Sequence, residues 1–272
     1  MKRTLTFIIA TALTIGAQAQ AIFKATKYHA PIKVEKKWKK YNPGEVEFHD
    51  EAPESEGSKI YHNIIPNPAP YIQENALRVL QTLYWGPKDP NVPKLKRIIY
   101  TIKDYNGISE KYGHGDHVGI RYSTNWIERC FAGNDTLRLD YETRGVLYHE
   151  LTHAYQLSPE GCGQYDGKSE YWIFIEGMAD AVRVANGGFH GEADRPKGGN
   201  YMDGYRRAGY FFVWLRDNKD PEFLRKFNRS TLEVVPWSFD GAIKHVLGEQ
   251  YNIDDLWKEY QLAMGDIKEG EA

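Results

Sequence analysis

The segments that decide how this chain folds are His149-Glu150-Leu151-Thr152-His153 and Glu176-Gly177-Met178-Ala179-Asp180. The first has the pattern H-E-x-x-H. On a helix, residues four positions apart lie one turn apart on the same face. His149 and His153 can therefore offer two imidazoles to one metal ion, with Glu150 beside them as a general base. The alternative interpretation is two surface histidines on an ordinary helix.

The second segment supplies a carboxylate that would complete the site. Glu176 follows His153 at a distance that lets a second helix return antiparallel beside the first. Three protein ligands with a fourth position left for water are typical of a catalytic zinc site rather than a structural one. Asp180 lies one turn beyond Glu176 and is predicted to orient His149 by contacting that imidazole without binding the metal. An ion pair between Asp180 and Arg183 is the alternative.

These residues predict hydrolysis by an activated water. Zn²⁺ held by two neutral imidazoles and an ionised carboxylate lowers the pKa of its water toward ~7 and polarises a substrate carbonyl. Glu150 would take the proton from that water and pass it to the leaving amine.

The N-terminus has the pattern of a secretory signal peptide over residues 1–19. Lys2 and Arg3 precede an apolar run over residues 5–15, and Ala17-Gln18-Ala19 forms a cleavage site. The apolar run is shorter than the ~20 residues of a membrane span, and no later run approaches that length. We therefore expect an exported protein, periplasmic or secreted, with no membrane span. A buried N-terminal strand or helix is the alternative.

Composition and charge limit the kinds of partner that this protein can bind. The formal charge of −2 becomes −4 once Lys2 and Arg3 are removed, which argues against nucleic-acid binding. The basic run over residues 36–40 contains Trp38 and is interpreted as a solvated face rather than a binding patch. Cys130 and Cys162 flank the H-E-x-x-H segment, and export permits a disulfide between them. Two unpaired thiols are equally compatible with the sequence.

Hydrophobic periodicity places strands early and helices late, an α+β arrangement. Strands are predicted over residues 33–35, 46–48, 96–102 and 117–122. Helices are predicted over residues 71–85, 142–157, 171–185, 201–216, 221–227, 240–247 and 253–264. Thr143 or Asp140 is expected to cap the helix that carries the two histidines.

The segments at 145–153 and 175–183 resemble the plant basic secretory protein family, which has bacterial members. That family belongs to the zincin-like metallopeptidases, related to thermolysin and aminopeptidase N. The resemblance extends over roughly residues 58–262 and implies a zincin-like catalytic domain at 58–265, with an extension at 20–57. This chain is not basic, which departs from the family's charge.

The resemblance also implies further site residues. It implies a small mixed sheet whose edge strand lies over the active site and holds the substrate peptide; the matching residues are His117, Val118, Gly119 and Ile120. It implies a helix pair that binds the metal and a helical C-terminal part. Related peptidases use a Tyr or His to stabilise the oxyanion, for which Tyr205 is the candidate and His190 and Tyr155 are the rivals. A second metal site at His114, Asp116 and His117 is the less favoured interpretation of those residues.

Three functions are therefore compared. The leading one is a secreted zinc peptidase acting on peptides or proteins, with Glu150 as the base. The second is a non-catalytic, defence-type binding protein that keeps the zincin fold but has no need of Glu150. The third is a zinc hydrolase acting on glycoproteins or glycoconjugates, which the many Trp and Tyr residues permit.

Overall fold

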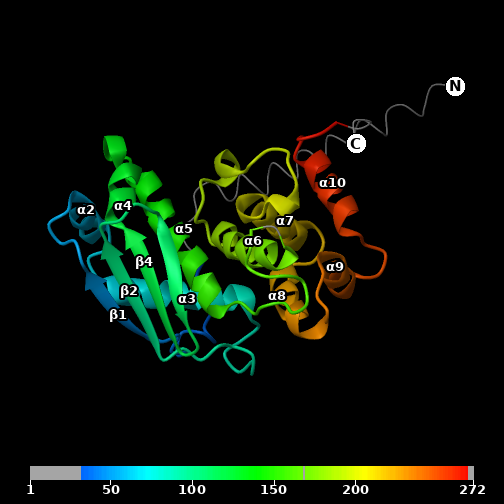
Figure 1. Cartoon of the computed structure of the whole chain (residues 1–272), viewed down its shortest axis with the longest axis horizontal. Helices are drawn as coiled ribbons and strands as arrows, with labels where there is room; N and C mark the ends of the chain where they lie inside the picture. The colour runs from blue at the N-terminus through cyan, green and yellow to red at the C-terminus, as the bar shows by residue number, and fades with distance from the viewer. Residues whose placement is uncertain (1–31, 168, 269–272) are drawn as a thin grey trace.

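The computed structural model describes residues 32–167 and 169–268 (Figure 1). The predicted signal peptide and the first part of the 20–57 segment lie outside the described residues. Within the described part, a four-stranded sheet stands beside a larger group of helices, so the predicted α+β class is confirmed. No helix among these residues is long and apolar enough to cross a membrane.

The sheet is mixed, with the strand order β1-β2-β4-β3. The strands β1 (Glu45–Asp50), β2 (Arg97–Lys103) and β4 (His117–Ser123) are parallel, and β3 (Ser109–His114) is antiparallel to β4. Ile98 of β2 pairs with Val118 of β4, and Tyr100 pairs with Ile120, so the buried side chains form rows on one face. β1 falls within the predicted extension, yet it pairs with β2 along its whole length.

The prediction that His117, Val118, Gly119 and Ile120 form the edge strand is wrong. They lie in β4, which has β2 on one side and β3 on the other. The edge position is taken by β3, whose sequence Ser-Glu-Lys-Tyr-Gly-His carries no run of apolar residues. Because one face of β3 borders a cleft, polar residues suffice there, and its hydrophobic pattern is too weak to predict a strand.

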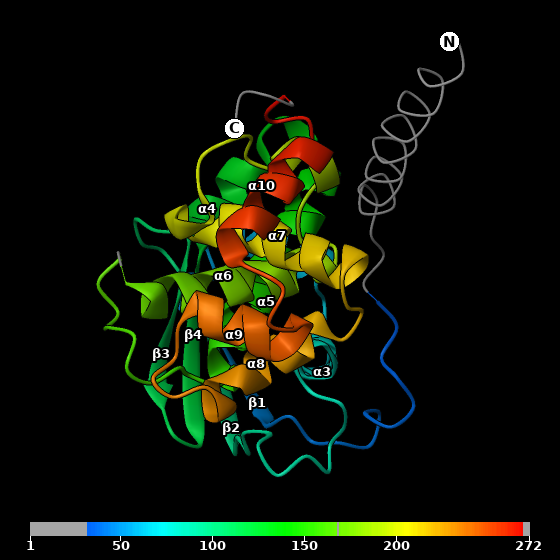
Figure 2. The ribbon, with the colours of Figure 1, turned by 90° about the vertical axis from the view of Figure 1, so that its right-hand side faces the viewer.

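The helices lie beside the sheet, with the C-terminal helices farthest from it in Figure 1 and in front of it in Figure 2. α2 (Glu56–Ile64) and α4 (Thr124–Cys130) pack together, and α3 (Pro68–Leu83) and α5 (Thr136–Tyr155) lie against each other. α6 (Glu170–Ala185) packs on α5 and on α7 (Tyr205–Asn218). The C-terminal part contains α8 (Phe223–Glu233), α9 (Phe239–Leu247) and α10 (Ile253–Ala263), so the predicted helical tail is confirmed.

Two predicted local features are wrong. α5 begins at Thr136, and the side chain of Asp135 caps it by accepting from the backbone N–H of Arg138, so neither Thr143 nor Asp140 is the cap. Residues 33–35 form no strand, because their apolar residue, Val34, is buried in the core from an irregular segment instead of alternating across a sheet. Among residues 36–40 the four lysines are exposed, as predicted for a solvated face, whereas Trp38 is buried in the core, which the sequence pattern did not predict.

Glycines allow α6 and α7 to approach closely. A Cβ on Gly177 would lie 2.7 Å from the Ala208 Cβ. A Cβ on Gly209 would lie 2.8 Å from the carbonyl carbon of Asp180. Such distances are too short for real side chains, so only glycine lets the two backbones meet here. The contact fixes α7 directly against the part of α6 that carries Glu176 and Asp180.

Candidate active site

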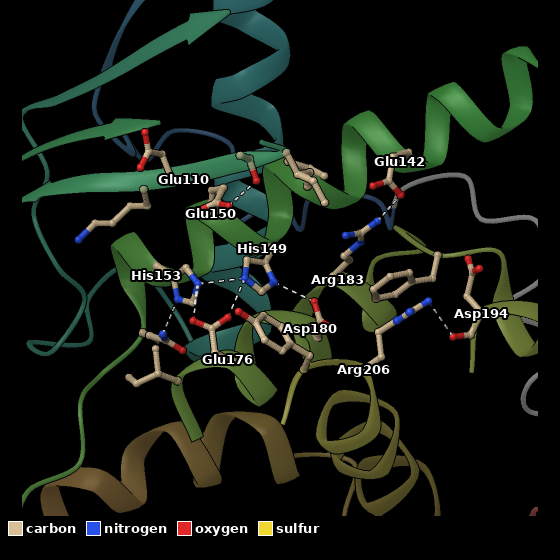
Figure 3. Close-up of a pocket in the computed structure, with 18 of the residues that line it drawn as sticks. Glu110, Glu142, His149, Glu150, His153, Glu176, Asp180, Arg183, Asp194 and Arg206 are labelled. Atoms are coloured by element: carbon tan, nitrogen blue, oxygen red, sulfur yellow. Dashed lines mark hydrogen bonds and ion pairs between the residues drawn. The ribbon is translucent and has the colours of Figure 1, made fainter. Parts of the chain in front are cut away.

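Two helices bring the predicted metal ligands together. His149 and His153 project from one face of α5, and Glu176 projects from α6 beside it. One ligand atom of each residue lies within 4.8 Å of the others, and this is the one group of three such residues found in the described part of the chain. Figure 3 shows these side chains converging, with Glu150 on the side of the strands.

His149 is held by carboxylates at both ring nitrogens. Its Nε2 lies 3.1 Å from Glu176 Oε2, and its Nδ1 lies 2.8 Å from Asp180 Oδ1 (Figure 3). Arg183, the alternative partner of Asp180, is ion-paired with Glu142 at 2.6 Å. Asp180 therefore contacts the ring nitrogen that faces away from the ligand cluster, which leaves Nε2 directed toward the cluster.

The cluster carries strongly shifted pKa values. Burial lowers the pKa of His149, but hydrogen bonds to Asp180 and Glu176 outweigh it and raise that pKa to about 10. Burial raises the pKa of Glu176, but hydrogen bonds to His149 and His153 outweigh it and hold that pKa well below its usual range. Without an ion, the site is thus an imidazolium–carboxylate pair. A metal ion would take the place of the proton on His149.

His153 completes the group with a looser set of contacts. Its Nε2 lies 3.0 Å from His149 Nε2 and 3.7 Å from Glu176 Oε1. Its Nδ1 lies 2.9 Å from the side-chain nitrogen of Gln156 at the end of α5. The three ligand atoms therefore face one common point, while the other nitrogen of each imidazole has its own side-chain partner.

Glu150 lies next to the ligands but is turned toward the sheet. It is buried, and the Ser109 hydroxyl of β3 donates to its Oε1 at 2.5 Å. Lys111, also on β3, is half-buried near it, and burial lowers the pKa of that lysine although the charge of Glu150 opposes the shift. The edge strand thus fixes one oxygen of the carboxylate.

Two tyrosines lie at the ligands, and the sequence predicted only one of them. The ring of Tyr205 stacks on His149 with centroids 6.0 Å apart, and burial raises the pKa of Tyr205 to about 12. The hydroxyl of Tyr165, from the loop between α5 and α6, donates to Glu176 Oε1. The one signal for Tyr165 was its position between the two motif segments, which does not distinguish it from other loop residues.

The other candidates lie elsewhere or have other partners. The Tyr155 hydroxyl is buried and donates to the Pro43 carbonyl at 2.6 Å, and the His190 ring stacks on Tyr141. Asp116 of the less favoured second site is ion-paired with Lys96 at 2.6 Å. Both cysteines are free thiols, Cys130 buried and Cys162 half-buried, so the structure has the unpaired alternative.

A cleft of about 1150 Å³ opens over the ligands. It is lined by residues of α5, α6 and α7 and by residues 108–111 at the free edge of the sheet. Residues 117–120 are not among its lining residues. The strand that borders the ligands is therefore β3, where the sequence had placed β4.

Comparison with known families agrees with the sequence resemblance. The model of a family described as peptidases of plants and bacteria, the basic secretory proteins, matches residues 44–260. The chain belongs to this family. The match begins just before β1 and ends in α10, so the basic secretory protein domain includes the whole sheet and the helices around the site. Comparisons with curated proteins and with solved structures gave no match.

Proposed function

We propose that this basic secretory protein is a zinc-dependent peptidase with Glu150 as its general base. The observation that carries the proposal is the convergence of His149, His153 and Glu176 within 4.8 Å, with the carboxylate of Glu150 beside them. Two imidazoles and one carboxylate are a ligand set that suits Zn²⁺ and leaves a position for water. The ligands are buried or half-buried and open on a cleft, as a catalytic rather than a structural site requires.

The chain's own residues account for the proton transfers. A bound zinc ion supplies a Lewis acid that polarises the scissile carbonyl and acidifies water. Glu150 accepts the proton of the attacking water and delivers it to the leaving amine. Ser109 donates to one oxygen of Glu150, and Glu150 lines the cleft, so the other oxygen is the one we propose as the proton acceptor. Asp180 holds His149 in the orientation that keeps Nε2 on the ligand side.

The free edge of β3 is the surface we propose for the substrate peptide. One side of β3 pairs with β4, and residues 108–111 border the cleft. An extended peptide can hydrogen-bond to such an edge as an added strand, which would lay its carbonyl over the ligands. Tyr205 and Tyr165 are the proposed donors to the developing oxyanion, since both lie against the ligands. The predicted signal peptide would place this activity outside the cytoplasm.

The test is digestion of a complex peptide library by the wild type and by Glu150→Gln, with zinc content measured on both. We expect stoichiometric zinc in both proteins and cleavage by the wild type only, reduced at least ~10²-fold in the variant because a general base contributes about that much. Zinc without cleavage would favour the non-catalytic binding protein. Equal cleavage by both proteins would show that Glu150 is not the base.

A further inference from the structure

Gln156 is the side chain that contacts the outward nitrogen of His153. It follows the last residue of α5, and its backbone N–H caps the helix by bonding to the Thr152 carbonyl at 2.7 Å. Its side-chain nitrogen lies 2.9 Å from His153 Nδ1. Its side-chain oxygen, Oε1, is buried and has no hydrogen-bond partner among the described residues.

A bound ion would decide what partner the outer nitrogen of His153 needs. Its Nε2 faces His149 and Glu176. If Nε2 binds the ion, it must offer its lone pair, so the ring proton then lies on Nδ1, opposite Gln156. The partner that Nδ1–H needs is an acceptor, and a side-chain amide supplies one in its oxygen.

With the proton on Nδ1, the amide nitrogen of Gln156 would place one N–H against another. Rotation of the terminal amide by half a turn exchanges its nitrogen and oxygen, which have nearly the same shape. Oε1 would then accept from Nδ1–H at the position where the nitrogen now lies. Gln156 borders the cleft, so its amide has space in which to turn.

We infer that Gln156 is a positioning residue for His153, whose side-chain oxygen accepts the Nδ1–H when Nε2 binds the ion. The inference rests on the metal site of the proposed function. Asp180 orients His149 in the corresponding way, through a carboxylate that contacts its Nδ1. The two imidazoles would thus be oriented by unlike partners, one a carboxylate and one a neutral amide.

The test measures zinc affinity, by competition with a chelating dye, in three variants. Gln156→Leu keeps the size of the side chain but cannot accept, and we expect affinity 10–100-fold weaker than that of the wild type, the range found for partners behind metal ligands. Gln156→Glu can only accept, and we expect affinity equal to or tighter than that of the wild type. Gln164→Leu makes the same chemical change at an exposed position in the adjoining loop and should leave affinity unchanged.

A second readout follows the proton directly. In zinc-loaded protein, ¹⁵N and ¹H shifts of His153 should report a hydrogen-bonded Nδ1–H in the wild type and in Gln156→Glu, and an Nδ1–H without that hydrogen bond in Gln156→Leu. Melting temperatures and Gln156→Met check that any weakening is not loss of fold. Wild-type affinity in Gln156→Leu, or equal weakening in Gln156→Glu or in Gln164→Leu, would overturn the inference. If the wild type bound no zinc, the proposed function itself would fail; if it bound zinc and cleaved peptides while Gln156→Leu matched it, only this inference would fail.

Discussion

The contact between α6 and α7 makes Gly209→Ala a sharp test of how the fold supports the site. The added Cβ would lie 2.8 Å from both the carbonyl carbon and the Cβ of Asp180, and 2.9 Å from the backbone nitrogen of Ala181. Carbon atoms prefer about 3.5–4.0 Å, so the helices must separate by roughly 1 Å. Overpacking of this kind costs about 1–3 kcal/mol, while replacing a helical glycine by alanine returns about 1 kcal/mol.

The cost of overpacking should exceed the gain in helix propensity, because the atoms that the new Cβ meets are mostly backbone atoms, which cannot rotate aside. We expect a net destabilisation of up to about 2 kcal/mol in urea unfolding. We also expect zinc affinity about tenfold weaker, since a shift of Asp180 disturbs its 2.8 Å contact with His149. Ala208→Gly is the control: it loses about 1 kcal/mol of helix propensity without a clash, so stability should fall while zinc affinity stays unchanged. If Gly209→Ala were as stable as the wild type and bound zinc equally well, the proposed role of this contact would be wrong.

Two further predictions concern protons. Burial raises the pKa of Asp266, but the hydrogen bond from Arg195 outweighs it and lowers that pKa below its ordinary value of 3.8, and both side chains are almost fully buried. This stabilisation is therefore present above about pH 4 and is lost as pH falls through the lower pKa of the folded state. Asp266→Asn should lower the free energy of unfolding by about 3 kcal/mol at pH 7. The difference between variant and wild type should shrink in acid-unfolding measurements below pH 4. The pKa of His149, raised to about 10, predicts that zinc binding at pH 7 releases about one proton per ion from this residue. Calorimetry in buffers of different ionisation enthalpy measures that release, and no release would contradict the assigned pKa.

The helix pair was predictable because its signals are local. The spacing of His149 and His153, the carboxylate at Glu176 and the apolar periodicity of both segments all lie within single helices. The start of α5 was predicted too late, because the exposed first turns have no apolar stripe and the cap at Asp135 precedes residues of mixed character. Strand β3 was missed for a related reason: its residues are polar or charged and only half-buried at best.

What the sequence could not supply was which strand would stand beside the motif. A strand rich in buried apolar residues, such as β4, gives the clearer signal, but that same burial means it has neighbours on both sides and no free edge for a ligand. The strand with a free edge, β3, has the weakest hydrophobic pattern, because one of its edges and part of one face border the cleft. Ser109 illustrates the consequence: nothing in its local sequence marks it, yet β3 brings its hydroxyl to Glu150. In a site built between a helix and a sheet edge, the motif therefore identifies the helical half, and the strand half follows only from the topology.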